Sequence, residues 1–111
     1  MQPNAVTHVA ALTLNHEPVP AEQSVHDDPT TAATALGEFG GLEVGVWEMS
    51  PGVMTDVEAE ELFVVLSGAA TVEFDDGSPA LALRAGDVVR LAGGSHTVWT
   101  VTETLRKVYL A

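Results

Sequence analysis

The sequence contains no cysteine, so it forms neither disulfides nor thiolate metal ligands. No stretch approaches the roughly 20 consecutive apolar residues that a membrane-spanning helix needs. The N-terminus lacks a basic region followed by a continuous apolar core, so we expect no secretory signal. These absences favour a cytoplasmic protein, and a length of 111 residues predicts a single domain.

Basic residues are scarce and unevenly placed. The chain has 16 acidic and 4 basic residues and a net charge of −12, and no basic residue precedes Arg84. An acidic surface repels phosphate backbones and anionic lipids, which argues against nucleic-acid and membrane partners. Solvated acidic residues also aid solubility, and this ordinary role accounts for most of the charge.

Prolines interrupt the first third of the chain. We predict an N-terminal arm over residues 1–41 that is partly strand and packs on the main body or on a partner subunit. It is irregular to about residue 35, and its one strand-like run is Val6–Leu14. A short helical turn over Thr30–Leu36 is an alternative that threonine, a poor helix former, disfavours.

From Leu42 onward, short apolar runs alternate with turn residues, a pattern typical of antiparallel strands. We expect Ser67-Gly68 to be one of the turns, between separate strands at 62–66 and 71–74. The other predicted strands are 42–49, 80–84, 88–91, 97–102 and 105–110. With no long helical period, the fold class is all-β, and residues 42–111 form a sandwich or a barrel.

Two glycine-bounded segments follow the motif spacing of a known family. Six residues separate Glu61 from Gly68, and Gly86 leads to Gly94 with Ala92 where the family has proline. With this spacing the chain resembles the cupins, which are small jelly-roll barrels.

Further segments narrow the resemblance to one branch. Residues 45–52, Asp56 placed five residues before Glu61, and residues 99–109 are similar to the (S)-ureidoglycine aminohydrolase-like and ethanolamine-utilisation-type cupins. The resemblance implies a single jelly-roll barrel over 42–111 with an irregular N-terminal arm. By family habit it also implies a homodimer.

The resemblance further implies a metal centre made of two histidines and a glutamate from the first motif and one histidine from the second. In this chain the corresponding positions are Met54 and Asp56, or Thr55 and Val57, followed by Glu61 and Thr97. Glu61 is the one straightforward match. The ligand set is therefore degenerate, and we expect no metal or a weakly held divalent ion, with Mn, Fe, Ni or Zn as candidates.

His96 is a candidate metal ligand beside Glu61, but it lies one residue before the expected position. A shift of one residue along a strand turns a side chain to the opposite face. Regular strand geometry would therefore point Thr97 inward and His96 outward. Only a bulge at Gly93-Gly94 would return His96 to the interior.

Glu61 and Asp56 are the candidate catalytic residues. Glu61 precedes the inward-pointing Phe63 and Val65, so its carboxylate is expected at the mouth of an apolar cavity. Asp56 is either a turn residue or a second carboxylate able to hold a hard cation or a substrate amine. The candidate pocket residues are Phe63, Val65, Thr97, Trp99 and Met54.

These residues support three hypotheses. The first is a cupin that binds a small amine- or amide-bearing molecule without a functional metal site. The second is a metal-dependent enzyme acting on C–N bonds of a small amine or ureido compound, with the metal as Lewis acid. The third is a non-catalytic structural or partner-binding subunit. Lys107 has no expected role, because nothing around it in the sequence marks it as a nucleophile.

Overall fold

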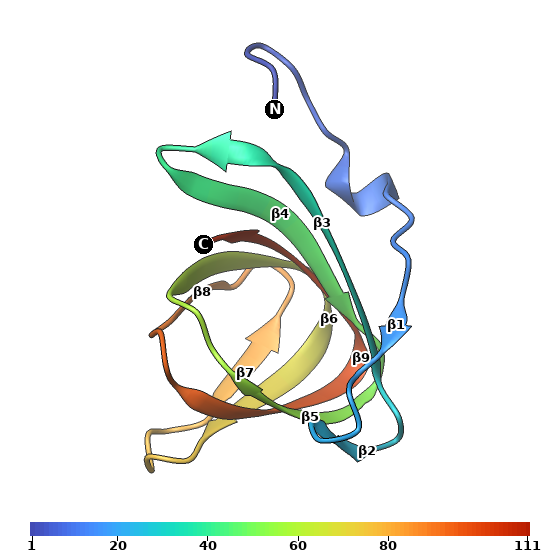
Figure 1. Ribbon diagram of the computed structural model, residues 1–111, viewed down its shortest axis with the longest axis vertical. Helices are drawn as coiled ribbons and strands as arrows, with labels where there is room; N and C mark the ends of the chain where they lie inside the picture. Colours follow the sequence, from blue (N-terminus) through green and yellow to red (C-terminus); the bar gives the residue numbers. More distant parts are fainter.

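The structure, a computed structural model that describes residues 1–111, is a curled antiparallel β-sheet (Figure 1). Its one helical segment is the 3-10 turn η1 (Val9–Ala11), and no helix has the length and hydropathy needed to cross a membrane. The all-β prediction is confirmed. The strands are β1 (Glu17–Pro18), β2 (Ser24–His26), β3 (Thr30–Phe39), β4 (Leu42–Met49), β5 (Gly52–Val57), β6 (Glu61–Phe74), β7 (Leu81–Arg84), β8 (Val88–Leu91) and β9 (His96–Leu110).

The long strands β6 and β9 connect the two parts of the sheet. The order on one path is β1-β3-β4-β9-β5-β2, while β6 pairs with β7, β8 and β9. One half of β9 pairs with β4 and the other half with β5, and β6 runs beside β9 along most of its length. Because both strands bend, the sheet curls on itself and encloses one core (Figure 1).

The predicted turn at Ser67-Gly68 is a bend within β6 rather than the end of a strand. The pairing of β6 with β9 shifts register between Val65 and Ala70, and Gly68 has a φ of +91°. A Cβ on Gly68 would lie 2.1 Å from the carbonyl oxygen of Thr104, so the two strands approach more closely than any side chain allows. Glycine here bends the strand without breaking its pairing.

Two expectations for the first third of the chain were wrong. The chain was expected to be irregular to about residue 35, but Thr30–Leu36 is part of β3, because β4 offers it a pairing edge and threonine favours strands. The disfavoured alternative of a helical turn there does not form either. Val6–Leu14 does not form the predicted strand. It contains η1, and no strand of the sheet pairs with it. The structure also forms β5, a strand absent from the prediction, which pairs with β9.

Alternation along the strands separates an inner from an outer face. Phe63 and Val65 on β6 and Trp99 on β9 are almost fully buried in the inner core. Val46 on β4 is also fully buried but does not belong to that core. It lies two residues before Glu48 on the strand, so alternation points both toward the outer face.

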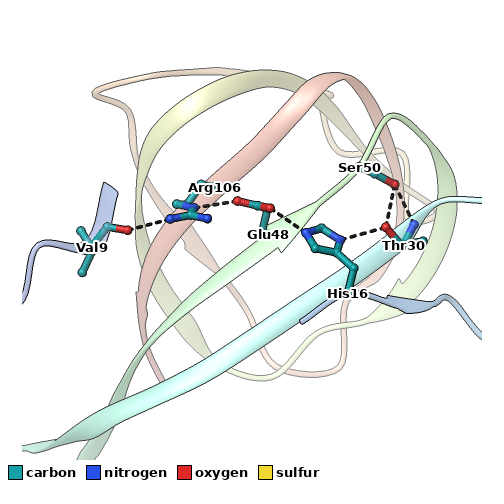
Figure 2. Close-up of polar contacts among 6 residues, drawn as sticks. All are labelled: Val9, His16, Thr30, Glu48, Ser50 and Arg106. Atoms are coloured by element: carbon teal, nitrogen blue, oxygen red, sulfur yellow. Dashed lines mark hydrogen bonds and ion pairs between the residues drawn. The ribbon is translucent and has the colours of Figure 1, made fainter. Parts of the chain in front are cut away.

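A chain of polar contacts, which we call the outer clasp, ties residues 1–16, called the arm from here on, to this outer face (Figure 2). Arg106 Nε donates to Glu48 Oε2 at 2.6 Å, and Arg106 Nη1 donates to the carbonyl oxygen of Val9 at 2.8 Å. His16 Nε2 lies 2.6 Å from Glu48 Oε1. The Glu48 and Arg106 side chains are 15% and 11% exposed, so this is a partly buried network.

The clasp also contains neutral groups. His16 Nδ1 lies 2.8 Å from Thr30 Oγ1, and the Thr30 amide donates to Ser50 Oγ at 2.7 Å. Figure 2 shows the six clasp residues in one line across β3, β4 and β9. The arm is thus held to three strands that lie side by side in the sheet.

The clasp predicts a pH dependence of stability. Burial raises the pKa of Glu48, but the hydrogen bonds and charges of His16 and Arg106 outweigh it and hold the pKa below its ordinary 4.5. Because the carboxylate is favoured in the folded state, its stabilisation is complete above about pH 4.5 and is lost as the pH falls below that value. Glu48→Gln should cost about 1.5–3 kcal/mol of unfolding free energy at pH 7, and the cost should shrink in acid.

Urea unfolding of both proteins between pH 7 and pH 3 measures this difference. Glu73→Gln, which changes an exposed glutamate on β6, is the control and should differ from the parent by a small constant amount. A Glu48→Gln cost that does not change with pH would contradict the role of the carboxylate.

Candidate functional site

One cavity opens at the inner face of the curled sheet. Its volume is about 220 Å³, smaller than the roughly 300–1,000 Å³ typical of pockets for drug-sized molecules. The lining comes from β3, β4, β5, β6, β9, the Glu58–Ala59 loop and the C-terminus. The lining residues are Ala33, Trp47, Asp56, Glu58, Ala59, Glu61, Trp99, Lys107, Tyr109 and Ala111.

Lys107 provides the one positive charge of this cavity. It is 4% exposed, and its Nζ lies 2.8 Å from Glu61 Oε1. Three aromatic rings surround the ammonium, with centroids 4.2 Å (Phe63), 4.5 Å (Trp47) and 5.0 Å (Trp99) from Nζ. Aromatic faces attract cations most strongly where water is excluded. A carboxylate and three rings therefore replace the hydration that the buried ammonium has lost.

Glu58 is a second buried carboxylate in the cavity wall. It is 7% exposed, and its Oε2 accepts hydrogen bonds from Thr97 Oγ1 at 2.7 Å and Trp99 Nε1 at 2.9 Å. Its Oε1 accepts no hydrogen bond from the protein. The two donors fix the orientation of the carboxylate, and the free oxygen belongs to a residue that lines the cavity.

Asp56 is the least compensated charge of the cavity. Burial raises its pKa above the ordinary 3.8, and the neighbouring charge of Glu58 raises it further, while the Val57 amide and the charge of Lys107 offset only part of this shift. The backbone amide of Val57, at 2.8 Å, is the only hydrogen-bond donor that reaches its carboxylate. A positively charged group placed beside Asp56 would therefore be stabilised.

Tyr109 forms the wall of the cavity next to β4. Its hydroxyl donates to Glu43 Oε2 at 2.8 Å, and its ring lies over Gly45, where a Cβ would come within 2.4 Å of the ring. Glycine at this position lets the tyrosine lie flat against the strand. Burial, the hydrogen bond to Glu43 and the nearby negative charges raise the pKa of Tyr109 to about 12.

The structure brings together part of the predicted site. Glu61, Asp56 and Trp99 line the cavity, and the ring of Phe63 lies 4.2 Å from the Lys107 ammonium. Met54 and Val65 are buried members of the core that do not line the cavity. Thr97 is buried and supports Glu58 instead of facing a ligand.

His96 does not join Glu61. The β5–β9 pairing runs without a register shift, with Asp56 opposite Thr97 and Val57 opposite His96. Since no bulge intervenes, alternation buries Thr97 and leaves the side chain of His96 exposed on the outside. The expected pairing of these two residues as metal ligands therefore does not form.

The remaining donors do not fit the usual cupin metal. No three His, Asp or Glu side chains gather closely enough to hold an ion. The carboxylate of Glu61 is already paired with the Lys107 ammonium, whose positive charge would repel a metal cation at that place. A metal bound through Glu61 would have to displace this ammonium.

Sequence reasoning missed Lys107 and Glu58. Lys107 shares a strand with Trp99 and is separated from it by an even number of positions, so alternation was the available signal for placing both on one face. For Glu58 there was no such signal, because it lies between β5 and β6 in the run Glu58-Ala59-Glu60-Glu61, which has the composition of a solvated loop.

Comparison with known proteins identifies the family. The model of the EutQ-like cupin domain matches residues 36–109. The chain belongs to the EutQ-like cupin family. This confirms the resemblance to the ethanolamine-utilisation cupins, while no functionally curated protein matches the chain significantly.

Solved structures agree with this assignment. A DUF861-family protein of unknown function from Pseudomonas syringae pv. tomato is 26% identical with a TM-score of 0.75, over 90% of this chain and 44% of that one. A putative ethanolamine utilization protein Q from Salmonella typhimurium is 20% identical with a TM-score of 0.63, over 74% and 68%. A cupin superfamily protein from Desulfitobacterium hafniense is 10% identical with a TM-score of 0.65, over 100% and 92%. The two more distant structures show the cupin fold alone.

The raised pKa of Tyr109 can be measured directly, because Tyr109 is the only tyrosine of this cupin. We expect tyrosinate absorbance after rapid jumps to alkaline pH, recorded before unfolding, to give a midpoint of about 12. Glu43→Gln should lower the midpoint toward the ordinary 10 without reaching it, because burial still disfavours the phenolate. Glu73→Gln, an exposed position on β6 opposite Val98, should leave the midpoint unchanged. An ordinary midpoint in the parent protein would refute the described environment.

Proposed function

We propose that this cupin binds a small amine-bearing molecule in the cavity, and that the Lys107–Glu61 pair occupies the place where other cupins use a metal. The observation that carries the proposal is the charge inside the cavity. Three carboxylates (Asp56, Glu58 and Glu61) face a single ammonium, and that ammonium is already paired with Glu61. Asp56 feels the charge of Lys107 but forms no ion pair of its own, and a ligand ammonium is the group that supplies one.

The cavity walls support the same ligand class. Trp47, Trp99 and Tyr109 offer aromatic surface beside the carboxylates. Aromatic faces together with carboxylates attract organic ammonium ions, while apolar ring surface holds a short alkyl chain. The free Glu58 Oε1 provides a further acceptor for an N–H group. The small volume limits the ligand to a compact molecule.

Three probes with the same number of non-hydrogen atoms test the charge preference: n-pentylamine, butyramide and butyrate. We expect the amine to bind most tightly, the amide weakly and the carboxylate not at all, because only the ammonium compensates Asp56. Trp47 and Trp99 are the only tryptophans of the chain and both line the cavity, so their fluorescence reports binding. For so small a ligand we expect Kd of roughly a millimolar.

Asp56→Asn should weaken amine binding about tenfold or more, since hydrogen bonds to charged groups contribute about 1.5–3 kcal/mol. Glu73→Gln is the matched control for loss of one negative charge away from the cavity, and it should bind as the parent does. Equal affinity for the three probes, or tight binding of butyrate, would contradict the proposal. So would a stoichiometric transition metal that is lost on Glu61→Gln.

A further inference from the structure

The strands β4 and β9 meet in two neighbouring cross-strand pairs that point in opposite directions. Trp47 lies opposite Lys107, and both line the cavity. One residue along, Glu48 lies opposite Arg106, and both point to the outer face, where they form the outer clasp (Figure 2). Since successive residues of a strand alternate between faces, the inner and outer pairs share the same stretch of backbone.

The clasp is also the main attachment of the arm. Between Met1 and His16, the polar contacts to the rest of the chain are those of the terminal amine with Leu36, of Val9 with Arg106, and of His16 with Glu48 and Thr30. Both oxygens of the Glu48 carboxylate are used, one by each neighbour. Glu48 thus joins β4, β9 and the arm at a single point.

We propose that Glu48 and Arg106 are positioning residues for the cavity, and that the arm is a strap that holds them in place. While the arm is bound to Glu48 and Arg106, β4 and β9 keep the Trp47 ring 4.5 Å from the Lys107 ammonium. Without these contacts of the arm, the hydrogen-bonded pairing of β4 with β9 opens locally more often, and water reaches the Lys107 ammonium. This inference rests on the proposed function only for its effect on ligand affinity.

The test compares three full-length variants. His16→Ala removes the contacts of the arm to Glu48 and Thr30 but leaves the Glu48–Arg106 pair and the contact of Arg106 to Val9. Arg106→Gln removes both the pair with Glu48 and the contact to Val9. Arg84→Gln is the matched control, because Arg84 is exposed on β7, a strand that does not line the cavity, and forms no ion pair. Each variant is examined under conditions where its own unfolding curve shows it to be folded.

Two readouts follow the cavity without any ligand. Acrylamide quenching reports access of small molecules to Trp47 and Trp99, and proton exchange of the lysine ammonium reports access of water to Lys107, the only lysine of the chain. We expect His16→Ala and Arg106→Gln to raise both several-fold, and Arg84→Gln to leave both unchanged.

If His16→Ala and Arg106→Gln behave like Arg84→Gln in both readouts, the inference is overturned, whatever the ligand experiments give. If Arg106→Gln does not fold, His16→Ala alone decides. A change in both readouts together with no binding of n-pentylamine to the parent protein would support the strap and refute the proposed function, so the two failures are distinguishable.

Discussion

The cavity of this cupin depends on the ion pair between Lys107 and Glu61. An ammonium 4% exposed to solvent is costly unless its surroundings replace the lost water. Here a carboxylate at 2.8 Å and three aromatic rings do so. The pair determines what else the cavity can hold, because it occupies the glutamate that a metal would need. It leaves Asp56 and Glu58 as the carboxylates open to a ligand.

The same segment of β9 serves the two faces of the sheet. Lys107 points into the cavity while its neighbour Arg106 points out to Glu48 and the arm. Three of the four basic residues of this acidic chain are paired with a glutamate: Arg90, Arg106 and Lys107. The scarcity of positive charge that is evident in the sequence therefore has a structural counterpart, since basic residues stand mainly where a particular carboxylate is held.

Period-two alternation and turn residues were enough to predict the all-β class and most strand positions after Leu42. They failed at Gly68. Glycine was read as the end of a strand, but Gly68 bends β6 without ending it, because the close approach of Thr104 is a tertiary contact that no local pattern reveals. They failed again at Thr30–Phe39, whose strand depends on the edge offered by β4. Glu61 and Asp56, which the motif spacing singled out, both line the cavity. The motif spacing gave no signal for Lys107, because a single lysine in an acidic chain is ordinarily expected on the surface.

The measurement that tests this account most directly is nitrogen-detected NMR of the side-chain ammonium of Lys107, which a chain with one lysine shows without ambiguity. The account predicts one ammonium signal that persists at neutral pH, because burial and the bond to Glu61 slow proton exchange. It also predicts upfield shifts of the lysine methylene protons from the three surrounding rings. An ammonium that exchanges as fast as that of free lysine, with unshifted methylene protons in the folded protein, would contradict the central claim.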